Sequence, residues 1–118
     1  MSILSLVALI PLSLFTIETA QAPSYPDPLR GIYLTSQTVS SAQGEKLVNE
    51  WKDVGGNMIV FDIQDSGGHL AYPSNIPVSI EINNRGKRIP DLAAVVKKLH
   101  DKNIYVVARY VLFKNGFL

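Results

Sequence analysis

The chain has 118 residues, with 11 Lys or Arg against 10 Asp or Glu, no cysteine and a formal net charge of +1. This length fits one small domain, and so weak a charge, with scattered basic residues, excludes the electrostatic footprint of a nucleic-acid-binding protein. The lack of cysteine excludes disulfides, a lipid-anchored cysteine and a thiolate metal site.

The amino terminus has the pattern of an export signal. Residues 3–17 are almost wholly apolar and lead to Ala20-Gln21-Ala22, the A-x-A pattern that signal peptidases cut. The apolar run is shorter than the roughly 20 residues of a membrane-spanning helix. Because no Lys or Arg precedes it and Pro23 follows the cut, an uncleaved anchor and a buried helix stay open as alternatives. We expect a signal peptide over 1–22 and a secreted or cell-envelope protein that meets a membrane only through this segment.

The next part of the chain predicts a linker, a strand and a helix. Residues 23–29 are rich in proline and form the linker, and residues 30–35 are β-branched and aromatic, as in a strand. A polar turn over 36–41 follows. Apolar residues then recur at helical spacing over 42–54, and Gly55-Gly56 ends this amphipathic helix.

The second half predicts two more strands around a long loop and a helix. The continuous apolar run over 58–62 is typical of a strand in a parallel sheet covered by helices. The loop over 63–88 is long enough to be functional, and residues 76–82 within it could form a short hairpin or an irregular lid. A helix begins near Pro90-Asp91, and a third strand spans 104–113.

The order strand, helix, strand, helix, strand predicts an α/β fold with parallel strands joined by crossovers. Three such strands with two helices leave both sheet edges and one face bare, which is unsafe for a free-standing domain. We therefore expect the chain to be the first part of a larger domain. A small flavodoxin-like module is the alternative, although the chain lacks a phosphate-cradling glycine loop after the first strand.

Three segments carry a resemblance to a known family: Gly31-Ile32-Tyr33-Leu34-Thr35, Asn57 to Gly68 (NMIVFDIQDSGG) and Ile104 to Lys114 (IYVVARYVLFK). Their order and spacing are similar to those of a bacterial family of TIM-barrel proteins known as "putative glycoside hydrolases". The resemblance covers about three-quarters of the chain, from Arg30 onward. It implies that residues 30–118 are the first three βα units of a (β/α)8 TIM barrel, incomplete as given.

The resemblance implies an exported carbohydrate-active protein that, when full length, hydrolyses glycosidic bonds by paired-carboxylate acid/base chemistry. It implies a poly- or oligosaccharide substrate and no cofactor. The chain departs from the family pattern at Gln64, where the family has Lys, and at Asn115, where it has Asp. Since the later barrel strands are missing, we expect the fragment itself to be inactive. A non-catalytic glycan-binding or cell-envelope protein on the same fold is the alternative.

Asp62 and Arg109 are charged residues in neighbouring apolar strands. Because a lone buried charge is costly, we expect them to form an ion pair at the mouth of the barrel. The competing interpretation gives Asp62 a direct catalytic or substrate-binding role, since ligands gather at the carboxyl ends of parallel strands. The other catalytic residues are unknown and are expected beyond Leu118.

Further candidate residues lie in the long loop. Asp65, beside Gly67-Gly68, either shapes an Asx turn or binds sugar, and the Tyr72 ring could stack on a sugar. The predicted substrate-binding set is Asp62, Asp65, Tyr72 and Arg109. Tyr33 could also stack on a sugar, but it is predicted to be a packed strand residue, and Tyr72 is the better binding candidate. His69 is a candidate for proton chemistry. No metal site is predicted, because neither histidine has ligand spacing to a carboxylate.

Overall fold

The structure is a computed structural model, and it describes residues 24–113 and 116–117. The predicted signal peptide over 1–22 and Asn115 lie outside the described residues. Within the described ranges, no helix is both long enough and apolar enough to cross a membrane.

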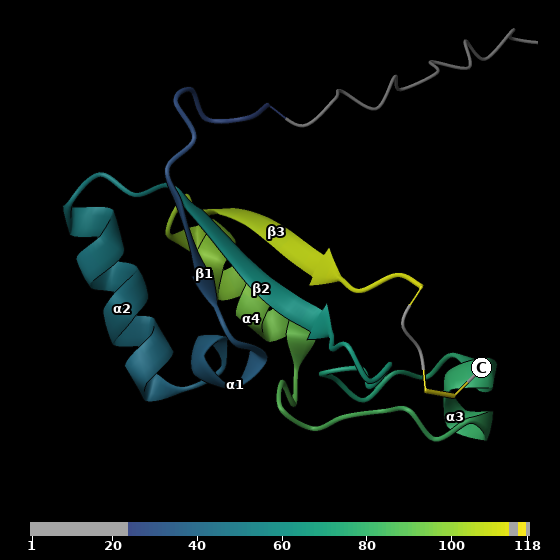
Figure 1. Ribbon diagram of the computed structural model, residues 1–118. Coiled ribbons are helices and arrows are strands. Elements are labelled where there is room, and N and C mark those ends of the chain that lie inside the picture. Colours follow the sequence, from purple (N-terminus) through teal and green to yellow (C-terminus); the bar gives the residue numbers. More distant parts are fainter. Residues whose placement is uncertain (1–23, 114–115, 118) are drawn as a thin grey trace, which may run out of the picture.

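Three parallel strands form one sheet, with two main helices on one of its faces (Figure 1). The elements in chain order are β1 (Gly31–Leu34), α1 (Ser36–Val39), α2 (Ala42–Asp53), β2 (Met58–Gln64), α3 (Pro77–Glu81), α4 (Leu92–Asp101) and β3 (Tyr105–Tyr110). The strand order is β1-β2-β3, and both strand pairs are parallel. The predicted α/β class is therefore confirmed, and the sheet is compatible with the first βα units of a barrel.

Local signals in the sequence explain where α2 and α4 begin and end. The Ser41 side chain accepts a hydrogen bond from the backbone N–H of Gly44 at 3.1 Å, and Asp91 caps α4 in the same way. Gly55, with φ of 90°, and Asn103, with φ of 55°, adopt the left-handed conformation that follows a helix end. These two helices match the predicted segments closely, because the helical periodicity and the capping residues indicate the same boundaries.

Two segments differ from the prediction. The polar turn over 36–41 contains the short helix α1, whose Thr35 cap accepts from the backbone N–H of Thr38. Residues 76–82, predicted as a hairpin or an irregular lid, instead form the single-turn helix α3. Pro77 stands at the start of α3, where its fixed φ suits a helix and its missing N–H costs nothing.

The hydrophobic core lies between the sheet and the helices. Ile59 and Phe61 of β2 are fully buried there, together with Val48 of α2 and Leu99 of α4. Because side chains alternate along a strand, the intervening residues of β2 point to the opposite face, which α2 and α4 leave uncovered. That face is only partly buried. The prediction that β2 is buried on both faces is therefore confirmed only for the face that α2 and α4 cover.

The linker touches the uncovered face near the start of the strands. The Tyr25 ring lies edge-on to the Tyr105 ring, with 5.2 Å between the centroids. Tyr105 begins β3 and pairs with Met58, which begins β2. Tyr25 is thus attached at the amino ends of the strands.

Candidate functional site

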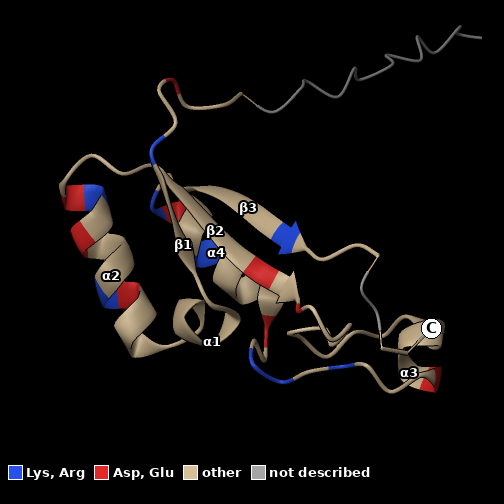
Figure 2. Cartoon of the chain, viewed as in Figure 1, with Lys and Arg blue, Asp and Glu red and all other residues tan. Residues whose placement is uncertain are grey.

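The carboxyl ends of the three strands bring Tyr33, Asp62 and Arg109 together. The β2–β3 register places Asp62 directly opposite Arg109, and the β1–β2 register places Tyr33 opposite Val60, one alternation away from Asp62. All three side chains therefore project from the face that the helices leave uncovered. The strands are otherwise mostly free of charge, whereas charged residues lie along α2 (Figure 2).

The three side chains form a connected cluster. Arg109 Nε lies 2.9 Å from Asp62 Oδ1, which confirms the predicted ion pair. The Tyr33 hydroxyl donates to Asp62 Oδ2 at 2.5 Å, and the Arg109 guanidinium carbon lies 5.5 Å from the centroid of the Tyr33 ring. The Asp62 side chain is 17% exposed and that of Arg109 is 54% exposed, so the carboxylate is enclosed and the guanidinium reaches solvent.

The electrostatics of the cluster set the protonation of Tyr33. The hydrogen bond to Asp62, followed by burial and by the Asp62 charge, raises the pKa of Tyr33, and the Arg109 charge opposes this shift. The phenol therefore stays protonated and acts as a donor. Asp62 Oδ1 is buried and receives no aligned hydrogen bond from any described residue, so its contact with Arg109 is ionic.

Asp65 is bound into the loop that follows β2. Its Oδ1 accepts hydrogen bonds from the backbone N–H groups of Gly67 at 2.9 Å and His69 at 3.0 Å, which forms the predicted Asx turn. Its Oδ2 lies 2.8 Å from Arg88 Nη2. Burial alone would raise the pKa of Asp65, but the hydrogen bonds from Arg88, His69 and Gly67 outweigh it and hold the pKa below its ordinary value.

The other two loop candidates lie apart from the cluster. His69 Nδ1 is 3.6 Å from Asp65 Oδ1, and its ring meets that of Phe117 edge-on at 4.9 Å. Tyr72 is half-buried against the hydrophobic core and lines a surface cavity with Leu92 and other residues of α4. Since α4 covers the opposite face of the sheet, the structure does not bring Tyr72 together with Asp62 and Arg109.

Gln64, one of the two departures from the family pattern, is 2% exposed at the end of β2. Its Nε2 donates to the Gly68 carbonyl at 3.2 Å, and Asn84 donates to the same oxygen. Within the described ranges, Gln64 Oε1 accepts no hydrogen bond. The residue therefore holds the loop against the strand from inside the protein.

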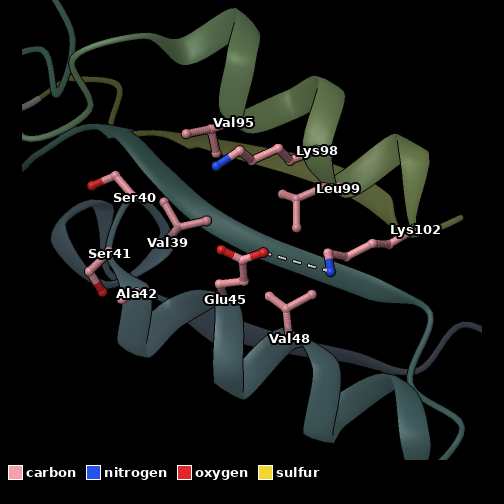
Figure 3. Close-up of a pocket in the computed structure, with 10 residues that line it drawn as sticks. All are labelled: Val39, Ser40, Ser41, Ala42, Glu45, Val48, Val95, Lys98, Leu99 and Lys102. Carbon is pink, nitrogen blue, oxygen red and sulfur yellow. Dashed lines mark ion pairs between the residues drawn. The ribbon is translucent and has the colours of Figure 1, made fainter.

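A separate cavity of about 220 Å³ lies on the helix side of the sheet, between α2 and α4 (Figure 3). Val48 and Leu99 line its apolar wall, and Lys102 Nζ lies 3.9 Å from Glu45 Oε1 across it. Lys102 also donates to Asn49 of α2 at 2.7 Å. This polar bridge ties the two helices together on the side of the sheet opposite to Asp62.

The described part of the chain holds no group of three His, Asp or Glu side chains that could bind a metal ion. The candidate site is the Tyr33–Asp62–Arg109 cluster, which joins a phenol, a carboxylate and a guanidinium at the carboxyl ends of the strands. The sequence predicted two of its three members. Tyr33 was missed as a member because its place beside Asp62 depends on the strand register, which the sequence does not reveal.

Comparison with known proteins places the chain in a family. A family model described as "Putative glycosyl hydrolase domain" matches residues 31–118. Among solved structures, the chain is similar to a hypothetical protein from Ruminiclostridium thermocellum ATCC 27405, with 36% identity and a TM-score of 0.67. The match covers 71% of this chain and 44% of that protein, so the chain spans less than half of its length. No curated protein matches the chain. The chain belongs to the "putative glycosyl hydrolase domain" family.

Proposed function

We propose that the chain is the amino-terminal part of an exported carbohydrate-active protein that hydrolyses glycosidic bonds in its full-length form. Family membership supports a carbohydrate substrate. The observation that carries the proposal is the cluster of Asp62 with Tyr33 and Arg109 at the carboxyl ends of adjacent parallel strands. This edge of an α/β sheet is where barrel enzymes handle their substrates.

We propose further that the three strands begin a TIM barrel. The sequential strand order, the position of α2 and α4 on one face and the greater length of the solved relative support this fold. In a closed barrel the uncovered face becomes the interior, which side chains such as Val60 and Val107 would fill. Asp62 and Arg109 would then stand at the mouth.

Glycoside hydrolysis needs one carboxyl group that donates a proton and a second that acts as base or nucleophile. Asp62 suits the second role, because a hydroxyl donor and a guanidinium surround it. Asp65 is a poor proton donor, since Arg88 and two backbone amides hold its pKa below the ordinary value. We therefore assign the proton-donating carboxyl group to a strand end beyond residue 118.

A non-catalytic glycan-binding or cell-envelope protein is the second candidate function. In its favour, both Asp62 oxygens are already engaged, one by the Tyr33 hydroxyl and the other by Arg109. A carboxylate held in this way suits a fixed binding surface as well as a reacting group. The two functions differ in whether strands beyond β3 end in Asp or Glu.

The test is to read the coding DNA beyond Leu118, to produce the full-length protein and to assay it on a panel of polysaccharides and aryl glycosides. We expect hydrolysis, and we expect Asp62→Asn to lower kcat/KM by about 100-fold or more. Asp53→Asn, which changes an exposed carboxylate at the end of α2, is the matched control and should keep full activity. Binding without hydrolysis would support the second function, and neither binding nor hydrolysis would refute both.

The export proposal rests on the apolar run over 3–17 and the Ala20-Gln21-Ala22 pattern. It is tested by fractionating cells that express the full-length gene and sequencing the amino terminus of the product. We expect envelope or secreted material that begins near Pro23. A cytoplasmic product that begins at Met1 would refute export.

A further inference from the structure

We propose that the Arg109 guanidinium is a carboxylate-binding subsite, so that the substrate of this site contains an acidic sugar, a uronic acid. This inference rests on the proposed function and names its substrate class. It is argued from the contacts that Arg109 makes and from those that it leaves open.

The guanidinium is oriented on two sides. Its Nε lies 2.9 Å from Asp62 Oδ1, and its central carbon stands 5.5 Å from the centroid of the Tyr33 ring. Asp62 is itself held by the Tyr33 hydroxyl, so the three groups fix one another. A planar donor group that is positioned in advance loses little freedom when it binds a ligand.

The outer edge of the Arg109 guanidinium is open among the residues that the structure describes. Arg109 is paired with Asp62, with Nε as the contacting atom, and neither Nη group donates a hydrogen bond to residues 24–113 and 116–117. More than half of the side chain, 54%, is exposed on the face that the helices leave uncovered. Two parallel N–H groups at such an edge match the two oxygens of a carboxylate, whereas a sugar hydroxyl can use only part of this geometry.

The acidic residues described near Arg109 are all paired. Asp65, the neighbouring acidic residue at the end of β2, is paired with Arg88 at 2.8 Å and accepts two backbone hydrogen bonds. The residues of β2 and β3 that precede Asp62 and Arg109 on the same face are apolar, Val60 and Val107. A carboxylate that approaches Arg109 therefore meets the outer edge of a guanidinium whose acidic neighbour, Asp62, is already paired with it and hydrogen-bonded to Tyr33.

The experiment compares two matched probes on the full-length protein: cellotetraose and the same tetrasaccharide oxidised to the carboxylate at C6. Binding is measured by isothermal titration calorimetry and by NMR shift perturbation. We expect the carboxylated probe to bind at least ~10-fold more tightly, as one charge-assisted bidentate pair allows. This preference should weaken as the salt concentration rises, a check that needs no variant.

Three variants locate the effect. Arg109→Gln should abolish the preference, and Arg109→Lys should lose most of it, because an ammonium keeps the charge but lacks the planar fork. Arg85→Gln, which removes an exposed arginine of the long loop, should keep it.

Equal binding of both probes by the wild type, or a preference that survives in Arg109→Gln, would overturn the subsite. Hydrolysis of neutral glycans with no such preference would overturn the subsite while the proposed function stands, and no binding or hydrolysis of any glycan would overturn both.

Discussion

At the scale of single residues, the two carboxylates at the end of β2 have different surroundings although they stand three positions apart. Asp62 meets a phenol and a guanidinium across the strands, whereas Asp65 meets backbone amides and Arg88 within its own loop. Sequence reasoning predicted the Asp62–Arg109 pair because two charges in apolar strands need each other. It could not predict Arg88 as the partner of Asp65, since a loop contact across 23 residues leaves no pattern.

The Asp65 network predicts a pH-dependent stability. Asp65→Asn should lower the free energy of unfolding by about 1 kcal/mol at pH 7, because the ion pair with Arg88 is lost at a partly exposed site. The folded-state pKa of Asp65 lies below its ordinary value, so its contribution is present above about pH 4 and is lost as the pH falls through the folded-state pKa.

Urea unfolding at pH 7 and at pH 3 measures this effect, with Asp53→Asn as the control variant. The gap between the wild type and Asp65→Asn should narrow at the lower pH, while Asp53→Asn should follow the wild type at both. A gap of equal size at both pH values would contradict the assignment.

At the scale of elements, the sequence predicted the long helices and missed the short ones. α2 and α4 extend over 12 and 10 residues, enough for an apolar stripe to repeat and for both ends to carry caps. α1 and α3 have 4 and 5 residues, about one turn each, so no periodicity can develop. Their formation depends on a cap at Thr35 and on Pro77, signals that also occur in ordinary turns.

The contact between α1 and α2 predicts an effect opposite to helix propensity. A Cβ at Gly44 would collide with the backbone carbonyl of Thr38 and crowd Val39. Alanine is favoured over glycine inside a helix by about 1 kcal/mol, yet we expect Gly44→Ala to destabilise the protein by about 1–3 kcal/mol. Gln43→Ala, at the adjacent exposed position, is the control and should be nearly neutral. Urea unfolding measures the stability of both variants. A Gly44→Ala variant that is more stable than the wild type would show that α1 shifts to make room for the added methyl group.

At the scale of the whole molecule, the helices protect only one side of the sheet. Val60 and Val107 lie on the uncovered face, and β1 and β3 are edge strands. Apolar faces and unpaired edges promote association between chains. The strand order and the parallel pairing were predictable from the sequence. What covers this face was not, because α2 and α4 both lie on the other face.

We therefore expect the 118-residue chain, produced alone, to self-associate and to release no reducing sugar from polysaccharides. Sedimentation velocity over a range of concentrations measures the association, and a reducing-sugar assay measures the activity. Val60→Lys should weaken the association because it places a charge on the uncovered face, whereas Val54→Lys, at a position already 74% exposed, should not. A chain that stays monomeric or hydrolyses polysaccharide would contradict this expectation.

The contact between Tyr25 and Tyr105 fixes a polarity for the whole domain. It attaches the linker at the amino ends of the strands, whereas Asp62 and Arg109 stand toward their carboxyl ends. Anything that tethers the protein through its amino terminus, a bilayer or a translocation pore, therefore holds the domain by its base. The cluster lies at the end of the sheet away from Tyr25.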